Sequence, residues 1–269
     1  MKDKRILYVS SEVVPYLPET EIASTAFNVA KKAHSKGVQT RIFMPRFGVI
    51  NERRHQLHEV IRLSGMNLII NDMDMPLIIK VASIPKERMQ VYFIDNDEYF
   101  KRKAIFSDED DALFSDNDER AIFFAKGVVE TVKKLNWAPD IIHVHGWMAS
   151  LLPLYLKEYY SEEPLFSESK IVISVYNKDF EGTLNKDLVE KIKFDKISDD
   201  KTSVLEEPNY INILKSAVSN SDAIVHGSQE IPKELLDEIN KTDVPKLSYQ
   251  QEDSYEEYLN FYKELISEE

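Results

Sequence analysis

The sequence has 269 residues, of which 47 are acidic and 34 basic, so its formal net charge is −13. This charge argues against nucleic acid and acidic membrane surfaces as partners, because both repel an acidic protein. The absence of cysteine excludes disulfides, thiolate nucleophiles and cysteine-ligated metal centres. The first apolar run, residues 6–9, is too short for a signal peptide, and nothing approaches a membrane span, so we expect a cytoplasmic protein.

The first 45 residues predict a strand, a helix and a second strand. Residues 5–10 form an unbroken apolar run, which is typical of a buried strand. Residues 21–35 carry apolar side chains at helical spacing and are followed by Gly37, and residues 39–44 form a second apolar run that Pro45 ends. Strand, helix and strand with short links predict a βαβ unit and a parallel sheet.

The same alternation continues along the chain. Further strands are predicted at residues 68–70, 77–81, 90–94, 141–145, 171–176 and 223–227, the last taken as the final strand. Helices are predicted at residues 117–135, 149–160 and 211–220. We therefore expect an α/β fold with a doubly wound, mostly parallel Rossmann-like sheet.

Two segments interrupt this alternation, and one helix follows them. Residues 108–118 hold six acidic side chains and predict a surface loop, and residues 241–251 predict a linker. After it, aromatic and aliphatic residues at helical spacing predict an amphipathic terminal helix within residues 252–269. The expected organisation is a domain at residues 1–240, the linker, and a helix that docks back on the domain.

Common motifs of phosphate, metal and nucleophile sites are missing. The seven glycines are too far apart for a G-x-G-x-x-G or P-loop pattern, and no G-x-S-x-G is present. His143 and His145 leave the same face of a strand and could chelate zinc with Asp140, but without cysteine or H-E-x-x-H we interpret them as an ordinary hydrogen-bonded pair. We expect neither a metal nor a cofactor.

Polar residues follow several predicted strands, and their carboxyl ends should share one edge of the sheet. Glu12 follows the first strand, His145 and Trp147 follow a later one, and Tyr176 and Asn177 follow the next. Polar donors and acceptors beside an aromatic ring suit a sugar, whose apolar face Trp147 or Tyr176 could cover. We expect these five side chains to form a glucan or sugar site, with His145 the candidate for a remnant catalytic role.

Several stretches resemble bacterial glycogen and starch synthases, which use ADP-glucose and have the two-domain GT-B fold. The opening I-L-Y-V-S-S-E-V-V-P-Y at residues 6–16 resembles their opening, and P-D-I-I-H-V-H-G-W at residues 139–147 resembles P-D-I-V-H-x-H-D-W. Residues 43–48, 93–100, 116–124 and 175–182 resemble further family stretches in the same order. The resemblance runs from residue 5 to about residue 235 and implies one half of a GT-B fold, the acceptor-side domain.

The departures from the family pattern fall on its reactive positions. The family's K-T-G-G loop, whose lysine reaches the donor phosphate, falls on Pro18, Glu19, Thr20 and Glu21, which form a degenerate donor loop. The aspartate of the same motif falls on Ser24. The aspartate of H-D-W falls on Gly146, and the histidine of I-H-N falls on Tyr176. The family's active-site histidine is kept as His145, its tryptophan as Trp147 and its asparagine as Asn177.

The resemblance also implies a second domain that holds ADP-glucose, and we expect it to be missing here, while residues 255–263 are similar to the aromatic helix that ends the synthases. We expect a protein that is inactive alone and acts as a glucan-binding or regulatory module, with an α-glucan or maltooligosaccharide or another protein of glycogen metabolism as partner. Two alternatives stay open. The chain could be the acceptor half of a split glucosyltransferase, or an interaction scaffold without a sugar site.

Overall fold

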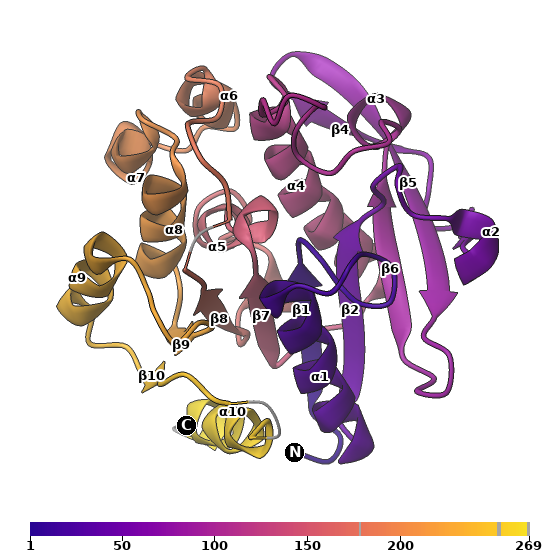
Figure 1. Ribbon diagram of the computed structural model, residues 1–269, viewed down its shortest axis with the longest axis vertical. Helices are drawn as coiled ribbons and strands as arrows, with labels where there is room; N and C mark the ends of the chain where they lie inside the picture. The colour runs from indigo at the N-terminus through magenta and orange to yellow at the C-terminus, as the bar shows by residue number, and fades with distance from the viewer. Residues whose placement is uncertain (178, 252–253, 268–269) are drawn as a thin grey trace.

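The computed structural model describes residues 1–177, 179–251 and 254–267. One twisted sheet runs through the molecule in the order β10-β9-β8-β7-β1-β2-β6-β5-β3, and β4 pairs with β5 (Figure 1). The strands are β1 (Arg5–Ser10), β2 (Gln39–Pro45), β3 (His58–Glu59), β4 (Met66–Ile70), β5 (Met73–Ser83), β6 (Gln90–Asp95), β7 (Ile141–His145), β8 (Lys170–Val175), β9 (Ala223–His226) and β10 (Lys246–Leu247).

The sheet is parallel from β10 to β6, and β5 then runs antiparallel to β6, β3 and β4. Its central strands are buried at almost every residue because helices cover both faces, which explains their unbroken apolar runs. The expected doubly wound α/β fold, mostly parallel and followed by a terminal helix, is confirmed.

Two groups of helices cover the sheet. The α-helices are α1 (Glu21–Ser35), α2 (Glu52–His55), α3 (Asp97–Phe100), α4 (Asn117–Leu135), α5 (Leu152–Lys157), α6 (Leu188–Phe194), α7 (Asp199–Thr202), α8 (Tyr210–Ser219), α9 (Lys233–Lys241) and α10 (Glu256–Ser267). Helices α1 and α10 contact each other in front of the sheet in Figure 1, whereas α5 contacts α4 and α8 in the second group. The reversal of strand order at β1 produces this division.

Three details differ from the sequence prediction. The helix expected at residues 149–160 is a 3₁₀ turn, Trp147–Ala149, followed by the short α5, because the chain turns sharply at Gly146 and Pro153 then starts the helix at its first turn. The strand at residues 223–226 is not the last one, since residues 246–247 inside the expected linker pair with β9 as β10. Helices α6, α7 and α9 were not predicted.

Helix α10 packs on the domain through its aromatic face. Tyr258 and Tyr262 are buried, and the Tyr262 hydroxyl lies 2.5 Å from Nδ1 of His143 in the middle of β7. Glu256 at the start of the helix forms ion pairs with Lys32 and Lys36 of α1. The terminal helix thus completes the cover of the sheet beside α1. Among the described residues, no helix has the length and apolar character needed to cross a membrane.

Candidate functional site

The carboxyl ends of β1, β7, β8 and β9 lie next to one another in the sheet. Ser10 pairs with His145, His145 with Ser174, and Val175 with His226, so the segments that follow these strands meet at one edge. This is where open α/β sheets bind ligands. The structure therefore brings together the strand-end residues that the sequence selected.

His143 and His145 form a buried pair with ring centroids 4.0 Å apart, and each ring hydrogen-bonds neighbouring hydroxyl groups. Nε2 of His143 lies 2.8 Å from the Ser174 hydroxyl, in addition to its contact with Tyr262, and Nδ1 of His145 lies 2.8 Å from the Tyr176 hydroxyl. Nε2 of His145 is buried without a partner among the described residues. Burial lowers the pKa of His143 well below its usual range and that of His145 to about 3, so both rings are neutral at physiological pH.

Trp147 is completely buried. Its ring packs between Phe106 and Phe180, at centroid distances of 4.8 and 5.0 Å, and its indole N–H is buried with no partner in the described chain. The ring therefore has no face open to a sugar, contrary to the stacking role expected from the sequence.

Tyr176 is also enclosed, with 3% of its surface exposed. Its hydroxyl contacts His145, its carbonyl accepts a hydrogen bond from Tyr210, and its ring lies so close to Gly227 that a Cβ there would stand 2.7 Å from it. Tyr176 thus packs against the site and orients His145, and it presents no ring face for stacking.

Gly146 occupies a conformation that side chains rarely adopt. Its φ of 78° and ψ of 157° lie in a region used almost only by glycine, and a Cβ at this position would stand 2.5 Å from Oγ of Ser11. Oγ of Ser11 in turn accepts a hydrogen bond from the N–H of Met148. The Ser11 side chain, directly after β1, therefore occupies the space that a Cβ at position 146 would need.

The degenerate donor loop closes the N-terminus of α1 with its own side chains. Thr20 is the N-cap, and its hydroxyl accepts from the N–H of Ala23 and lies 2.5 Å from a carboxylate oxygen of Glu12, to which it donates. Glu21 accepts a hydrogen bond from the Ser228 hydroxyl. A helix N-terminus is a ready anion site, but here a hydroxyl and a carboxylate occupy it.

The other two residues of the loop add to its acidic character. Pro18 and Glu19 are exposed, and the Glu19 carboxylate accepts a hydrogen bond from Ser24 at 3.2 Å. Proline carries no backbone N–H and no charge that could reach a phosphate. The loop therefore presents two carboxylates and no cation of its own.

Asp179, which sequence reasoning missed, lies beside Glu12. Its carboxylate accepts a 3.3 Å hydrogen bond from the N–H of Trp147. Burial, together with the nearby charge of Glu12, raises the pKa of Asp179 to about 7, and burial also raises the pKa of Glu12. No sequence signal marks Asp179 as buried, because the loop that follows β8 folds back over residues far away in the chain.

A pocket of about 290 Å³ opens beside Asn177. Its wall includes the rings of Phe180 and Tyr210, the amide residue Asn209 and Pro232. Asn177 is exposed, and its N–H donates to the Ser228 hydroxyl at 3.0 Å. Phe180 and Tyr210 are only 7% and 5% exposed, so the pocket offers a sugar mainly the amide groups of Asn177 and Asn209.

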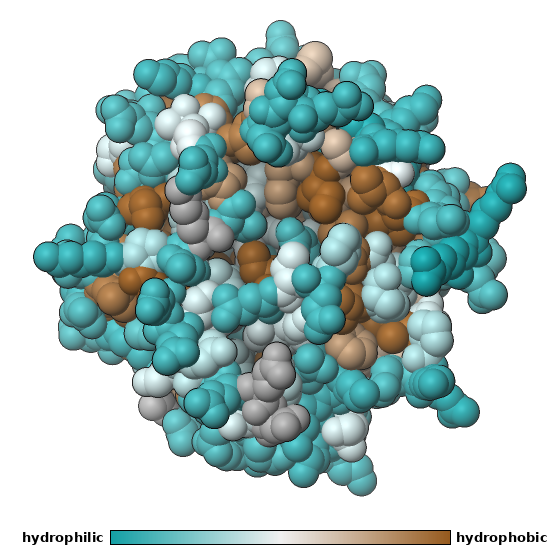
Figure 2. All heavy atoms as spheres, viewed as in Figure 1, coloured by the Kyte–Doolittle hydropathy of each residue, from teal (hydrophilic) through white to brown (hydrophobic). Residues whose placement is uncertain are grey.

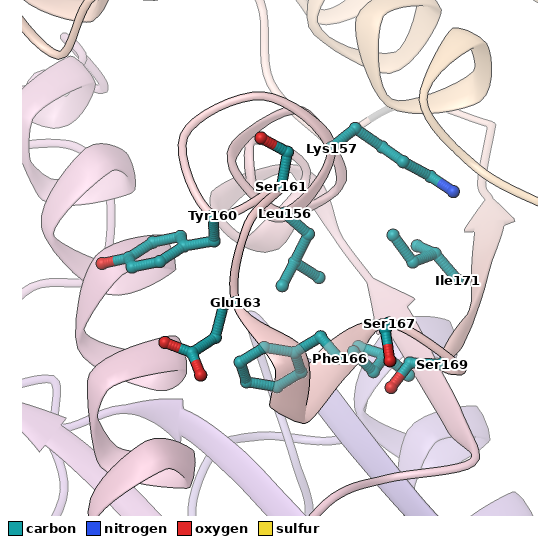
Figure 3. Close-up of a pocket in the computed structure, with 10 residues that line it drawn as sticks. Leu156, Lys157, Tyr160, Ser161, Glu163, Phe166, Ser167, Ser169 and Ile171 are labelled. Atoms are coloured by element: carbon teal, nitrogen blue, oxygen red, sulfur yellow. The ribbon is translucent and has the colours of Figure 1, made fainter.

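A second hollow, drawn in Figure 3, lies away from this edge. Leu156 and Phe166 close it between α5 and the 3₁₀ turn Pro164–Phe166, near the amino ends of β7 and β8. It measures about 160 Å³. Because it lies at the opposite ends of the strands, it takes no part in the candidate site.

Comparison with known proteins gives a consistent result. The family described as "Starch synthase catalytic domain" matches residues 5–247. Glycogen synthase from Chlorobium limicola is 34% identical over 233 residues, which cover 86% of this chain and 47% of that protein. Glycogen synthase from Chlorobaculum tepidum is 33% identical over 248 residues, 91% of this chain and 49% of that protein.

A solved structure supports the same fold. The catalytic domain of starch synthase IV from Arabidopsis thaliana, bound to ADP and acarbose, superimposes with a TM-score of 0.68 at 16% identity. The match covers 83% of this chain and 45% of the plant chain. The chain spans about half the length of the curated relatives it matches.

Proposed function

The chain belongs to the starch synthase catalytic domain family, and we propose that it binds an α-glucan at the carboxyl edge of its sheet without transferring glucose from ADP-glucose on its own. One arrangement carries the proposal: an open pocket beside Asn177 lies at the same sheet edge as an α1 N-terminus closed by Thr20 and Glu21. The first feature supports acceptor binding, and the second argues against donor binding.

The pocket beside Asn177 replaces Trp147 and Tyr176 as the candidate sugar subsite. Phe180 and Tyr210 line it but are only 7% and 5% exposed, so the amide group of Asn177, rather than a stacking ring, would pair with sugar hydroxyls. Glu12 and His145 lie deeper at the same edge, and His145 keeps Nε2 without a partner in the described chain. A glucan would therefore run from the pocket toward these two residues.

Electrostatics argue against a donor diphosphate at the degenerate loop. Glu12, Glu19, Glu21 and Asp179 gather around the start of α1, and no cation among the described residues forms an ion pair with any of them. Like charges repel a diphosphate, and stabilising the charge that develops on the leaving group usually dominates such transfer. The proposal therefore assigns this chain a binding or regulatory role, in which another protein of glycogen metabolism is the candidate partner.

A second candidate function is the acceptor half of a glucosyltransferase that another polypeptide completes. The buried, unpartnered Nε2 of His145 favours it, because a buried polar atom without a partner costs free energy unless a ligand uses it. The acidic start of α1 opposes it. The two candidates differ in whether an added donor-domain protein restores transfer.

We expect a linear maltooligosaccharide to bind the purified chain saturably, and Asn177→Ala to weaken the association constant about tenfold, the loss of one or two well-made hydrogen bonds. Isothermal titration calorimetry measures this effect. Asn67→Ala is the matched control, because Asn67 is an exposed amide on β4, away from the pocket.

The same samples are assayed for glucosyl transfer from ADP-glucose, which we expect at the level of a buffer blank. Transfer well above the blank would overturn the proposed inactivity. Absence of binding at millimolar sugar, or equal binding by the Asn177 and Asn67 variants, would overturn the glucan site and favour a scaffold.

A further inference from the structure

A third hollow, of about 580 Å³, lies between α2 and the turn that joins β5 to β6, remote from the pocket beside Asn177. Its lining includes Arg54 and His55 from α2 and Lys86 and Arg88 from the turn. The two pockets have no lining residue in common. In Figure 2, hydrophilic side chains project from the right-hand edge of the molecule, where α2 lies in Figure 1.

The hollow is basic although the protein carries a net charge of −13. Among its described lining residues there is no carboxylate, and Arg54, Lys86 and Arg88 form no ion pair with any described residue. The acidic side chain of the turn, Glu87, is bound instead to Lys31 of α1 at 2.8 Å. Three cations are thus left facing one hollow without counter-charges.

The charges on α2 are separated in the same way. Glu52, the acidic residue of this helix, is bound to Lys80 at 2.8 Å and contacts Arg46 at 3.4 Å. Arg54 and His55, two and three residues later, are left on the side of the hollow. On both elements that border the hollow, the acidic residue (Glu52 or Glu87) is paired with a lysine outside the hollow, whereas basic residues line it.

A buried polar atom also lines this hollow. Tyr16 is 5% exposed, and its hydroxyl is buried without a hydrogen-bond partner among the described residues. Its ring is held by Phe93 and His55, at centroid distances of 4.9 and 5.0 Å. Since a buried hydroxyl is normally paired, a ligand bound in the hollow would lower the free energy by supplying the partner.

We propose that this hollow binds a phosphate ester of the size of a hexose phosphate. Arg54 and Arg88 present guanidinium groups that pair with phosphate oxygens in bidentate fashion, and Lys86 adds a third positive charge. The Tyr16 hydroxyl and the amides of Gln56 and Gln90, which also line the hollow, suit sugar hydroxyls. The volume falls in the range of small-molecule sites, roughly 300–1,000 Å³.

The location gives such a ligand a route to the sheet edge. Tyr16 lies two residues before Pro18, on the same β1–α1 loop whose Glu12 and Thr20 are joined by a hydrogen bond. A ligand that fixes Tyr16 therefore fixes one end of the degenerate donor loop. This site does not depend on glucan binding.

The test is calorimetric titration with three probes: a hexose 6-phosphate, inorganic phosphate and the neutral hexose. We expect the hexose phosphate to bind most tightly, inorganic phosphate more weakly, and the neutral hexose not at all. Arg54→Gln and Arg88→Gln should each weaken binding of both phosphates about tenfold, whereas Arg62→Gln, an exposed charge outside the lining, should leave it unchanged.

Tyr16→Phe separates a built site from general attraction. It should weaken the binding of the hexose phosphate several-fold and leave the binding of inorganic phosphate unchanged, because only the sugar reaches the Tyr16 hydroxyl. Thermal denaturation of each variant confirms folding. The proposal is overturned if hexose phosphate fails to bind the folded wild-type chain, if the Arg62 variant loses as much affinity as the other two, or if polyglutamate competes equally well, which would indicate a nonspecific basic surface.

Discussion

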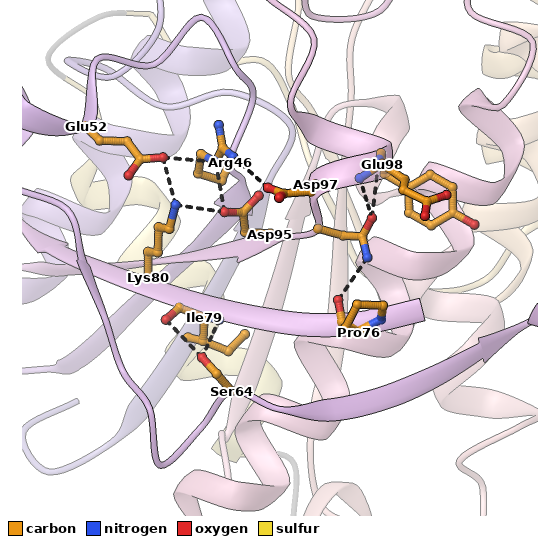
Figure 4. A network of polar contacts seen from close by, with 11 residues as sticks. Arg46, Glu52, Ser64, Pro76, Ile79, Lys80, Asp95, Asp97 and Glu98 are labelled. Atoms are coloured by element: carbon orange, nitrogen blue, oxygen red, sulfur yellow. Dashed lines mark hydrogen bonds and ion pairs between the residues drawn. The ribbon is translucent and has the colours of Figure 1, made fainter. Parts of the chain in front are cut away.

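Two clusters of charged side chains lie toward the carboxyl ends of the parallel strands, and they differ in how their charges are compensated. In the first cluster, Arg46 directly follows β2, Asp95 ends β6, Lys80 comes from β5 and Glu52 from α2 (Figure 4). Asp95 is fully buried and lies 2.9 Å from Nε of Arg46 and 3.0 Å from Nζ of Lys80. Lys80 reaches Glu52 as well, so positive and negative groups alternate.

The second cluster, at the ends of β1, β7 and β8, has no such alternation. Glu12, Glu21 and Asp179 are held by hydrogen bonds from Thr20, Ser228 and the backbone of Trp147, and no described cation pairs with them. Burial, together with the nearby charge of Glu12, raises the pKa of Asp179 to about 7.

The difference separates structural charge from candidate functional charge. In the first cluster, ion pairs around the buried Asp95 join the end of β2 to β5 and β6. Of the second cluster, Glu12 is buried, Asp179 half-buried and Glu21 exposed. A buried carboxylate without a cation raises the free energy of the folded state, which natural proteins tolerate mainly where a site requires it. The two histidines next to the second cluster, neutral and with one free ring nitrogen, fit the same description.

Breaking the compensated cluster should have the largest effect. Asp95→Ala leaves Arg46 and Lys80 beside a buried site without their shared partner, and we expect it to lower the free energy of unfolding by about 3–5 kcal/mol. Urea denaturation measures the change. Asp97→Ala is the control, because Asp97 is 71% exposed and 4.0 Å from Arg46, and should cost less than about 0.5 kcal/mol. Equal losses in both variants would refute the distinction.

Placing a carboxylate at position 146, beside the second cluster, should be the next largest change. Gly146→Asp must adopt a glycine-only conformation and place a Cβ 2.5 Å from Oγ of Ser11, so we expect a loss of roughly 3 kcal/mol in unfolding free energy. The double variant with Ser11→Gly should recover part of it.

Gly182→Ala is the matched control for Gly146→Asp. Its φ is 83° but nothing lies within 4 Å of its Cβ, so it carries only the backbone cost, about 1 kcal/mol. Thermal or urea denaturation of the three variants orders these effects. A Gly146 variant as stable as the Gly182 variant would show that Ser11 moves freely and that the carboxylate is not excluded by packing.

The sequence was sufficient for elements whose pattern is local. The apolar runs of β1, β7 and β8 and the caps of α1 lie within a few residues of the predicted bounds, because burial on both faces and helix ends each leave a short-range signature. Helices α6 and α7 were missed because each has fewer than eight residues, too few to show helical periodicity. The two residues of β10 carry no pattern at all.

The strand ends that carry the candidate site residues meet at one edge of the sheet as predicted, but the burial of the side chains there was not foreseen. Whether Trp147 is exposed depends on Phe106 and Phe180, which arrive from loops 41 and 33 residues away in the chain. The basic hollow likewise depends on which way Glu52 and Glu87 turn. Such properties follow from long-range packing, so a single sequence without its structure does not reveal them.

The smallest expected effect concerns Asp179 and its pH dependence. Because its folded pKa of about 7 exceeds the unfolded value, the folded chain binds the proton more tightly, and stability decreases as pH rises from about 4 to 7. Asp179→Asn removes this penalty, so the variant should exceed wild type by roughly 2 kcal/mol at pH 8 and equal it near pH 4.

The buried histidines affect both proteins in the opposite direction: because their pKa values are lowered, stability falls as pH drops below about 6.5. This contribution is the same in the variant and the wild type, so the difference in their stabilities reports on Asp179 alone. Urea titrations at the two pH values measure that difference, and Asp74→Asn, at an exposed position on β5, serves as the control. An Asp179 variant without a gain at pH 8 would mean that a counter-charge or solvent already compensates this carboxylate, which would remove the electrostatic contrast between the two clusters.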